Sequence, residues 1–291
     1  MTNGKPLKIA IASGKGGTGK TLLSTNLAAF LSRKQKALLV DLDVEEPDDF
    51  LFIHGITENK TDQYKMIPEW VESKCIPCDV CSNTCKFHAV IRLGTFIAVF
   101  KELCHSCYAC SELCPAGALP MIEHKIGEIK TITSGNLIFI ESRLEIGEEQ
   151  AVPLIHQTHE LVDKNFNDIQ IQLFDCPPGT SCPLVAATKN VDFVMLVTEP
   201  TPFGLNDLRL TVETMRRLKK PMGVVINRSD IGNNEVEKYC EQEQIPILAH
   251  IPYDRQIAEN YSKGELVYDK IGHITHSFLQ ILAFIQNINK A

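Results

Sequence analysis

The chain has 291 residues, of which 44% are hydrophobic, and its net charge is −7. That length is enough for one large α/β domain and a small insert. The negative charge and the lack of a basic block argue against nucleic acid as a partner. No apolar run reaches the ~18 residues of a membrane span. The polar first residues lack the apolar core of a secretory signal, so we expect a cytoplasmic protein.

The first expected strand, residues 7–12, leads into a glycine-rich loop that is followed by a helix over residues 20–32. The loop fits the phosphate-loop pattern G-x-x-x-x-G-K-[ST]. Glycines let a backbone wrap round an anion, and amides at a helix N-terminus point at phosphate oxygens. An ordinary glycine-rich turn before a helix is the alternative. The motif predicts that a nucleotide is bound by Gly14, Lys15, Gly16, Gly17, Thr18, Gly19, Lys20 and Thr21.

The second lysine of this loop, Lys15, directly follows the first glycine. The sequence Gly-Lys-Gly-Gly-Thr-Gly-Lys-Thr resembles the deviant phosphate loop of the MinD/ParA/Mrp ATPases and the nitrogenase iron protein. In that family the extra lysine reaches the nucleotide of the partner subunit. The resemblance therefore implies an ATP-dependent homodimer, or a heterodimer with a related ATPase. From the pattern alone, Lys15 could equally be a solvated side chain.

The second expected strand, residues 37–41, ends in Asp41-Leu42-Asp43, and residues 44–52 are expected to form a loop or switch before a short helix. Phosphoryl transfer needs magnesium ligands and a positioned water. Asp43 resembles the aspartate that orients this water in the MinD/ParA family, whereas Asp41 could support magnesium indirectly or end the strand. We expect catalytic roles for Lys15, Lys20 and Asp43. The expected Mg²⁺ ligands are Thr21, Asp43 and Asp175.

The α/β pattern stops near residue 59, and eight of the eleven cysteines lie between residues 75 and 114. They form two runs with the spacing C-x2-C-x2-C-x3-C, which is the pattern of bacterial two-cluster ferredoxins. Three thiolates of one run cap a cubane cluster, and the fourth ligand comes from the other run. Paired zinc sites are the alternative. One expected 4Fe–4S cluster is bound by Cys75, Cys78, Cys81 and Cys114, and the other by Cys85, Cys104, Cys107 and Cys110.

The other cysteines and the nearby histidines are not expected to bind a cluster. Cys240 lies in an expected helix and suits a small buried residue. Cys182 occupies the offset of a cluster ligand in the nitrogenase iron protein, but residues 141–153 hold no second cysteine, so we expect a free thiol. His88 and His105 are expected at the surface. Lys86 replaces the proline that ferredoxins usually have after the fourth cysteine.

Residues 125–143 are expected to form a hairpin that turns at residues 134–136, and residues 147–166 a loop and a helix; the α/β pattern resumes at residue 169. Alternating strands and helices predict a doubly wound, mainly parallel α/β sheet, and the phosphate-loop motif assigns it to the P-loop NTPase class. The last helix suits a core element better than a membrane anchor because basic residues are few. The expected strands are 169–175, 193–198, 222–227 and 247–251, and the expected helices are 184–189, 204–218, 234–243 and 273–288.

Three further motifs complete the expected nucleotide site. Asp175 ends a buried strand at a Walker B position, and Asp175-Cys176-Pro177-Pro178-Gly179 resembles the switch of the Mrp-like branch. Gly179 could bring its amide to the γ-phosphate. Asn227 resembles the asparagine that reads adenine in this family, although asparagine after a strand is often a turn former. Pro252 belongs to a segment that resembles the second base-binding loop.

The resemblance implies an ATPase domain over residues 1–58 and 126–291, with a ferredoxin-like α+β domain inserted at residues 65–125. The implied cofactors are ATP, Mg²⁺ and two 4Fe–4S clusters. The first hypothesis is an ATP-gated dimer that passes electrons through the clusters to a redox partner. The alternative is a carrier or assembly ATPase for clusters or metallocofactors. A positioning ATPase of the MinD/ParA kind is less consistent with the missing basic tail and basic patches.

Overall fold

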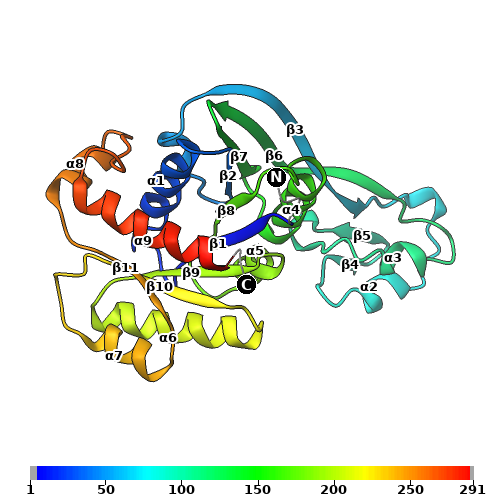
Figure 1. The fold of residues 1–291 in the computed structure, drawn as a ribbon. Coiled ribbons are helices and arrows are strands. Elements are labelled where there is room, and N and C mark those ends of the chain that lie inside the picture. The colour runs from blue at the N-terminus through cyan, green and yellow to red at the C-terminus, as the bar shows by residue number, and fades with distance from the viewer. Residues whose placement is uncertain (1–4, 289–291) are drawn as a thin grey trace. The chain divides into compact units, whose positions relative to one another are not determined.

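The computed structural model describes residues 5–288, and these divide into two compact units (Figure 1). The larger unit contains the chain up to Lys60, the segment Ile129–Arg143 and the chain from Ile155 onward. The smaller unit contains Thr61–Glu128 and Leu144–Leu154. The boundaries fall inside four regular elements: β3 (Ile56–Pro68), β6 (Met121–Ser134), β7 (Leu137–Leu144) and α4 (Ala151–Asn165).

A nine-stranded sheet has the order β11-β10-β9-β1-β8-β2-β7-β6-β3 within residues 5–288. From β11 to β7 the neighbouring strands are parallel, which confirms the predicted mainly parallel α/β fold. The residues of β1 and β2 are all buried, as expected for strands covered on both faces. The strands not yet bounded are β1 (Leu7–Ala12), β2 (Ala37–Asp41), β8 (Ile171–Asp175), β9 (Phe193–Thr198), β10 (Met222–Asn227) and β11 (Ile247–Ile251).

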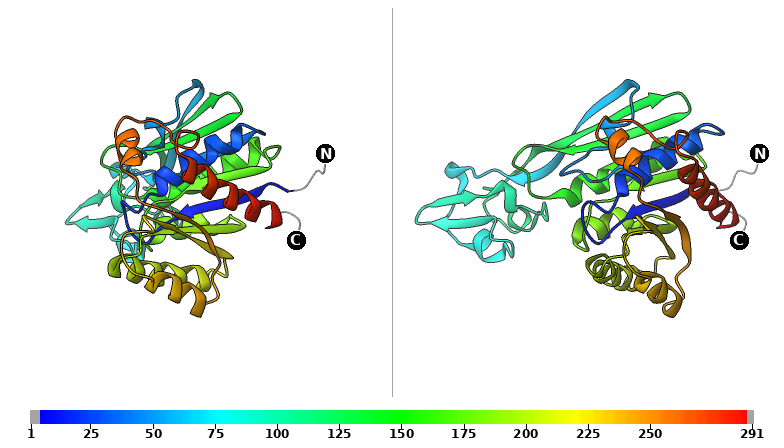
Figure 2. Two further views of the ribbon diagram at one scale, coloured as in Figure 1. Left: turned by 60° about the vertical axis from the view of Figure 1, so that its left-hand side comes forward. Right: turned by 90° about the vertical axis from the view of Figure 1, so that its left-hand side faces the viewer.

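The helices cover both faces of this sheet. The ring centroids of Phe30 in α1 (Lys20–Ser32) and Phe278 in α9 (Gly272–Ile288) are 5.9 Å apart. Both side chains belong to the same buried cluster as Leu173 of β8, so these two helices cover one face of the sheet. His159 of α4 contacts Phe174 on the opposite face, because neighbouring residues of a strand alternate. The other helices of this unit are α5 (Cys182–Lys189), α6 (Pro202–Arg217), α7 (Glu235–Gln242) and α8 (Arg255–Tyr261) (Figure 2).

The last helix, α9, is part of the core, as predicted. Its residues Ile274, Phe278 and Ile285 are buried in the same cluster as the strand residues. Among residues 5–288, we find no helix with the length and apolar character that crossing a bilayer would require.

The smaller unit is built from short elements, as the sequence led us to expect. It contains an antiparallel hairpin of β4 (Val90–Leu93) and β5 (Phe96–Val99), and the helices α2 (Val80–Thr84) and α3 (Ala109–Glu112). Its apolar residues form small clusters that include cysteines. One cluster has the buried members Cys81, Val90, Ile97, Cys110 and Leu119, and another has Ile67, Ala89 and Cys104.

Two features of the fold differ from the sequence-based expectation. β3 begins at Ile56, before the expected insert. Its first five residues are exposed and those after Ile56 are polar, so the sequence shows no hydrophobic alternation there. Residues 144–154 were expected in the ATPase domain, but they group with the smaller unit. The second difference has a clear cause, since Glu148 forms an ion pair with Lys65 there.

Candidate nucleotide and cluster sites

The glycine-rich loop joins β1 to α1, and close packing explains two of its glycines. A Cβ atom at Gly14 would lie 2.4 Å from the Asp207 carbonyl oxygen. Gly19 has a φ of +98°, and a Cβ atom there would lie 2.4 Å from the side-chain amide of Asn227. Both contacts are closer than real Cβ atoms allow, so larger residues would displace the loop. A side chain at either position would therefore require α6 or the Asn227 side chain to move.

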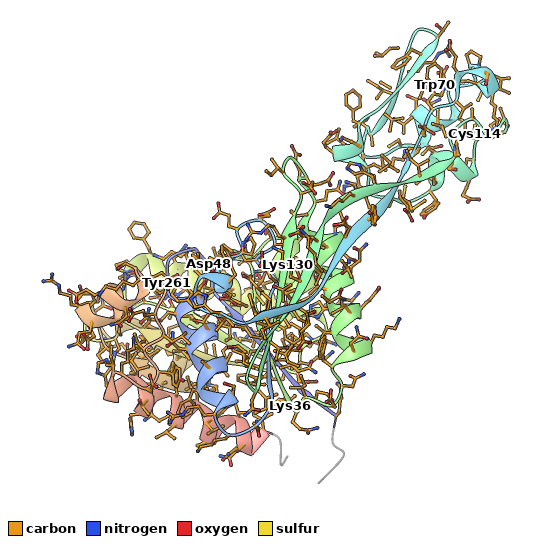
Figure 3. The ribbon with its side chains drawn as sticks, turned by 90° about the horizontal axis from the view of Figure 1, so that it is seen from above. Lys36, Asp48, Trp70, Cys114, Lys130 and Tyr261 are labelled. Atoms are coloured by element: carbon orange, nitrogen blue, oxygen red, sulfur yellow. The ribbon has the colours of Figure 1, made fainter. Side chains whose placement is uncertain are left out.

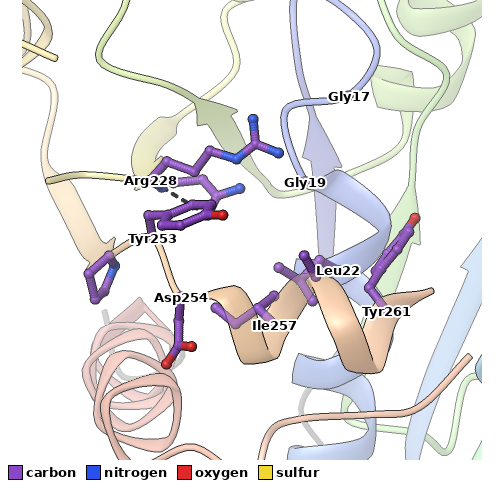
Figure 4. Close-up of a pocket in the computed structure, with 11 residues that line it drawn as sticks. Gly17, Gly19, Leu22, Arg228, Tyr253, Asp254, Ile257 and Tyr261 are labelled. Atoms are coloured by element: carbon purple, nitrogen blue, oxygen red, sulfur yellow. Dashed lines mark hydrogen bonds between the residues drawn. The ribbon is translucent and has the colours of Figure 1, made fainter. Parts of the chain in front are cut away.

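Asn227, which was predicted at the adenine site, links the end of β10 to this loop by a hydrogen bond. Its Nδ2 atom donates a hydrogen bond of 2.8 Å to the Thr18 carbonyl, and its Oδ1 atom accepts one from the Arg228 amide. Next to it lies a cavity of about 240 Å³ (Figure 4). The structure brings four residues of the predicted base site and loop to this cavity: Gly17, Gly19, Asn227 and Pro252.

Aromatic and apolar side chains complete the cavity, and the sequence did not predict most of them. Tyr253 and Arg228 lie above it in Figure 4, while Ile257 and Tyr261 come from α8. The short helix α8 follows the predicted base-binding loop directly, so its position after Pro252 was the available signal. Apolar walls with a few polar groups are typical of small-ligand pockets.

Carboxylates gather where β2 and β8 end. The two strands are in register with Asp41 beside Asp175, so the sheet itself brings these side chains together. The Thr21 hydroxyl donates to Asp48 at 2.9 Å and lies 3.3 Å from Asp175. The cluster also includes Asp49, which is fully buried. Asp48 and Tyr261 are labelled in Figure 3, and after burial it is the Asp48 carboxylate that most raises the pKa of Tyr261, to about 12.

Two residues of this cluster, Asp48 and Asp49, were missed from the sequence. Oxygen atoms of Asp41, Asp48 and Asp49 can lie within 4.8 Å of one another. The signal was present, since both lie within the predicted loop or switch, residues 44–52. It could not be used because an acidic pair in a loop is common on protein surfaces.

The pKa values of these carboxyl groups are raised because they are buried together. Burial raises the pKa of Asp43 to about 7 and that of Asp175 to about 6, and the Lys20 ammonium opposes both rises. The pKa values of Asp41 and Asp49 are raised well above the ordinary range, first by burial and then by Asp175. One oxygen of Asp49 and one of Asp175 are buried without a hydrogen-bond partner. Such oxygens fit Mg²⁺, which prefers oxygen ligands.

The segment after β8 differs from its expected arrangement. Gly179 has a φ of +91°, which suits glycine, but its amide donates to the Ser13 carbonyl at 3.0 Å. It is thus directed at the phosphate loop's own backbone, whereas we expected it at the γ-phosphate. Cys176 is fully buried, and burial raises the pKa of its thiol well above the ordinary value. Cys182 is exposed at the first residue of α5 and Cys240 is buried in α7, as expected.

The eight clustered cysteines line two separate small cavities in the smaller unit. We call them the first and second cysteine sets. Trp70 and Cys114, labelled in Figure 3, lie at the first cavity. Asp79 and Tyr108 take equivalent places in the two runs and have left-handed φ values of +61° and +64°. The first set is Cys75, Cys78, Cys81 and Cys114; the second is Cys85, Cys104, Cys107 and Cys110.

The thiol chemistry of these sets fits iron–sulfur clusters. Burial raises the pKa values of Cys81 and Cys104, and that of Cys110 to about 11. The neighbouring cysteines raise them further, since several thiolates repel one another. A metal cluster removes this cost because it binds the thiolates directly. His88 and His105 are exposed, and His105 stacks on Phe87 at 3.8 Å.

Comparisons with known proteins agree with this fold. The chain is 29% identical to the uncharacterised protein MJ0579 of Methanocaldococcus jannaschii, covering 88% of this chain and 90% of that protein. It is 23% identical to an iron–sulfur cluster carrier protein of Aquifex aeolicus, covering 96% of this chain and 67% of that protein. MinD of Pyrococcus horikoshii, solved with Mg-ADP, is 19% identical, with a TM-score of 0.62 and 97% of each chain covered.

A family model agrees over most of the chain. The model of the CobQ/CobB/MinD/ParA nucleotide binding domain matches residues 9–267, which include the glycine-rich loop and the carboxylate cluster. The chain therefore belongs to the CobQ/CobB/MinD/ParA family of nucleotide-binding domains.

Proposed function

We propose that this protein is an ATPase whose nucleotide state controls electron transfer through two 4Fe–4S clusters. The observation that carries the proposal is the union of two sites in one chain. A glycine-rich loop with a carboxylate cluster stands at the end of the sheet, and eight cysteines form two complete sets of four. A gating nucleotide and a redox cluster pair are the chemistry that these sites suit best.

In the nucleotide site, each residue has a role that its position supports. The buried Lys20 side chain lies close enough to Asp43 and Asp175 to lower their pKa values, so it belongs to the same charged site. Thr21 and Asp175 would hold Mg²⁺. Asp43 is less buried than Asp41 and would orient the attacking water. Bound Mg²⁺ would neutralise charge on the transferred phosphoryl group.

The contact between Gly179 and Ser13 suggests how the site could sense the nucleotide. The Gly179 amide donates to the backbone of the phosphate loop. A γ-phosphate offers stronger, charged acceptors, so the amide would exchange its partner when ATP is bound. Lys15 is half-buried in the same loop and would reach the nucleotide of a second subunit, as in ATPases with this loop. ATP would thus close a dimer.

The chain offers a physical route between the two sites. β2, which ends at the carboxylate cluster, pairs with β7 in register, with Asp41 beside Glu141. β7 leads directly into residues 144–154 of the smaller unit. A shift of β2 on nucleotide binding would therefore be passed along the chain to this unit.

One electron would enter from a low-potential protein donor, and one would leave to a protein acceptor.

A cluster carrier is the second candidate, and the relatives named as iron–sulfur cluster carrier proteins favour it. Those relatives are 23–26% identical, and this chain covers 64–67% of their length. Against this candidate, both cysteine sets offer four ligands, so their clusters would be firmly held and poorly suited as cargo. Transfer of labelled iron to an apo-protein would favour the carrier.

Two variants test whether the sites are separate and real. Lys20→Ala should abolish ATP hydrolysis and leave the iron content of anaerobically prepared protein unchanged. Cys78→Ser should lose one cluster and keep nucleotide binding. Normal hydrolysis by Lys20→Ala would show that the nucleotide site is misassigned, and unchanged iron in Cys78→Ser would show the same for the cysteine sets.

A further inference from the structure

The smaller unit contains a buried ion pair that neither proposed site uses. Lys65 of β3 contacts Glu148 at 2.8 Å, and their side chains are only 2% and 4% exposed. The other oxygen of Glu148 lies 2.7 Å from the Nε2 atom of His124, whose side chain is 19% exposed. Lysine is rarely buried, because removing its charge from water costs several kcal/mol before any partner is counted.

The ammonium group of this pair lies beside the second cysteine set. Lys65 and Ile67 point to the same side of β3, since strand residues alternate, and both are buried. Ile67 packs against Cys104 and Cys85. β3 is also hydrogen-bonded to this part of the chain, because the Ser106 hydroxyl donates to the carbonyl oxygen of Met66, next to Lys65, at 2.6 Å. Consistent with this placement, Lys65 opposes the rise in the pKa of Cys104 that burial causes.

The first cysteine set has a different electrostatic neighbour. Arg92 is a cation near Cys75 and Cys78, and it pairs with Asp79 at 2.7 Å. These two side chains are 29% and 43% exposed, so water screens their charges. The two sets therefore differ: the charge beside the second set is buried, and that beside the first set is solvated.

We propose that Lys65 makes the cluster of the second cysteine set the more easily reduced of the two. This inference rests on the proposed function, because it requires both clusters. A reduced cluster carries one more negative charge, and a buried ammonium nearby stabilises that charge. Within one chain, a single electron then leaves the first cluster, which is oxidised, and reaches the second cluster, which is reduced. No bond or proton changes in this step.

A redox titration of the full-length protein, followed by electron paramagnetic resonance, tests the proposal. The uncharged Lys65→Met variant should lower the midpoint potential of one cluster. The expected change in the one-electron equilibrium constant is at least tenfold, which corresponds to 59 mV. Glu148→Gln should raise the potential of the same cluster, since it leaves the ammonium without its counter-charge. Lys65→Arg should restore the original value.

Arg92→Met is the matched control, because it removes a cation beside the other set. It should change the one-electron equilibrium constant of the first cluster by less than tenfold, which is a shift in potential of less than 59 mV. The two signals are assigned with Cys78→Ser, which affects only the first cluster. A purely structural role for Lys65 would not give opposite shifts for Lys65→Met and Glu148→Gln.

The outcomes separate this inference from the proposed function. Two clusters correspond to about eight iron atoms per chain. If anaerobically prepared wild-type protein holds fewer than two clusters, both the proposed function and this inference are overturned. Loaded clusters whose potentials change less than tenfold in both Lys65→Met and Glu148→Gln would overturn the inference alone. If Lys65→Met does not load its clusters, an upward shift in Glu148→Gln supports the inference and its absence contradicts it.

Discussion

The nucleotide site and the cysteine unit are ordered by different forces. In the larger unit, fully buried parallel strands place the ends of β1, β2 and β8 side by side, so the carboxylates meet before any ligand is present. In the smaller unit the apolar core is small, and two of its buried members, Cys81 and Cys110, are themselves candidate ligands. Small cores of this kind usually need metal or disulfides for stability. The nucleotide site is therefore formed before any ligand binds, whereas the order of the cysteine unit would depend on the proposed clusters.

Removal of the clusters should therefore give the largest effect and confine it to one unit. Without iron, the thiols of the two sets would no longer be linked through a bound cluster, and the small core would lose that support. We expect amide exchange in residues 75–114 to accelerate more than tenfold, while β1 and β8 keep their protection. Hydrogen exchange with mass spectrometry, before and after anaerobic chelation, measures this. Equal acceleration in both units would show that they do not differ in this way.

The next largest effect should follow from Gly19→Ala, this time in the larger unit. The new Cβ atom would meet the Asn227 side chain at 2.4 Å, and alanine is strained at the φ of +98°. Left-handed strain alone costs about 1–2 kcal/mol. We expect ATP affinity to fall at least tenfold, with unchanged iron content, by calorimetry and iron analysis.

Gly272→Ala is the control for this substitution, because nothing lies within 4 Å of its Cβ position. This variant should bind ATP like the wild type. If Gly19→Ala also binds ATP normally, the close approach of Asn227 does not shape the site.

A smaller effect is expected from pH, acting through the carboxylates. The pKa of Asp43 is raised to about 7, so the folded state holds its proton at pH values where the unfolded state has lost it. The protonated carboxyl group of Asp43 therefore contributes fully to the free energy of unfolding below about pH 4. This contribution is lost as the pH rises through about 7. With Mg²⁺ chelated, Asp43→Asn should flatten the decline in melting temperature over this range.

The exposed Glu46→Gln provides the comparison for this pH effect, since Glu46 lies in the same loop. It should keep the wild-type slope, and adding Mg²⁺ should reduce the slope in wild type. A wild-type slope in Asp43→Asn would mean that the carboxyl group is not buried in the unliganded protein.

The smallest effect is expected for Asn227→Ala. This change removes the hydrogen bond to the Thr18 carbonyl, a contribution of about 0.5–1.5 kcal/mol. We expect ATP to bind roughly threefold to tenfold more weakly, without any change in the clusters, as measured by calorimetry. Unchanged affinity would place the base of the nucleotide away from Asn227.

The same contrast explains what the sequence could predict. Continuous apolar runs with turn residues at their ends identified β1, β2, β9, β10 and β11, and α1 followed from the loop before it. The cysteine spacing indicated which thiols share a cavity. These features are local, or they repeat with a fixed period, so a single sequence contains them.

The features that the sequence missed depend on contacts between distant residues. Lys65 and Glu148 are 83 residues apart, and nothing local to either predicts their pairing. Asp48 and Asp49 become part of the site because the end of β8 lies beside them. The contact of Gly179 with Ser13 likewise depends on the packing of two loops. Such contacts form only when distant segments pack together in the folded chain, so a local sequence pattern does not predict them.

The central claim is that the nucleotide state controls electron transfer. Its most direct test is the rate at which dithionite-reduced protein, freed of excess reductant, reduces a protein acceptor with and without Mg-ATP. Stopped-flow absorbance of the clusters records this rate, and Lys20→Ala serves as the control. We predict that Mg-ATP changes the rate at least tenfold in wild type and leaves it unchanged in Lys20→Ala. Equal rates with and without Mg-ATP in wild type would contradict the proposed function.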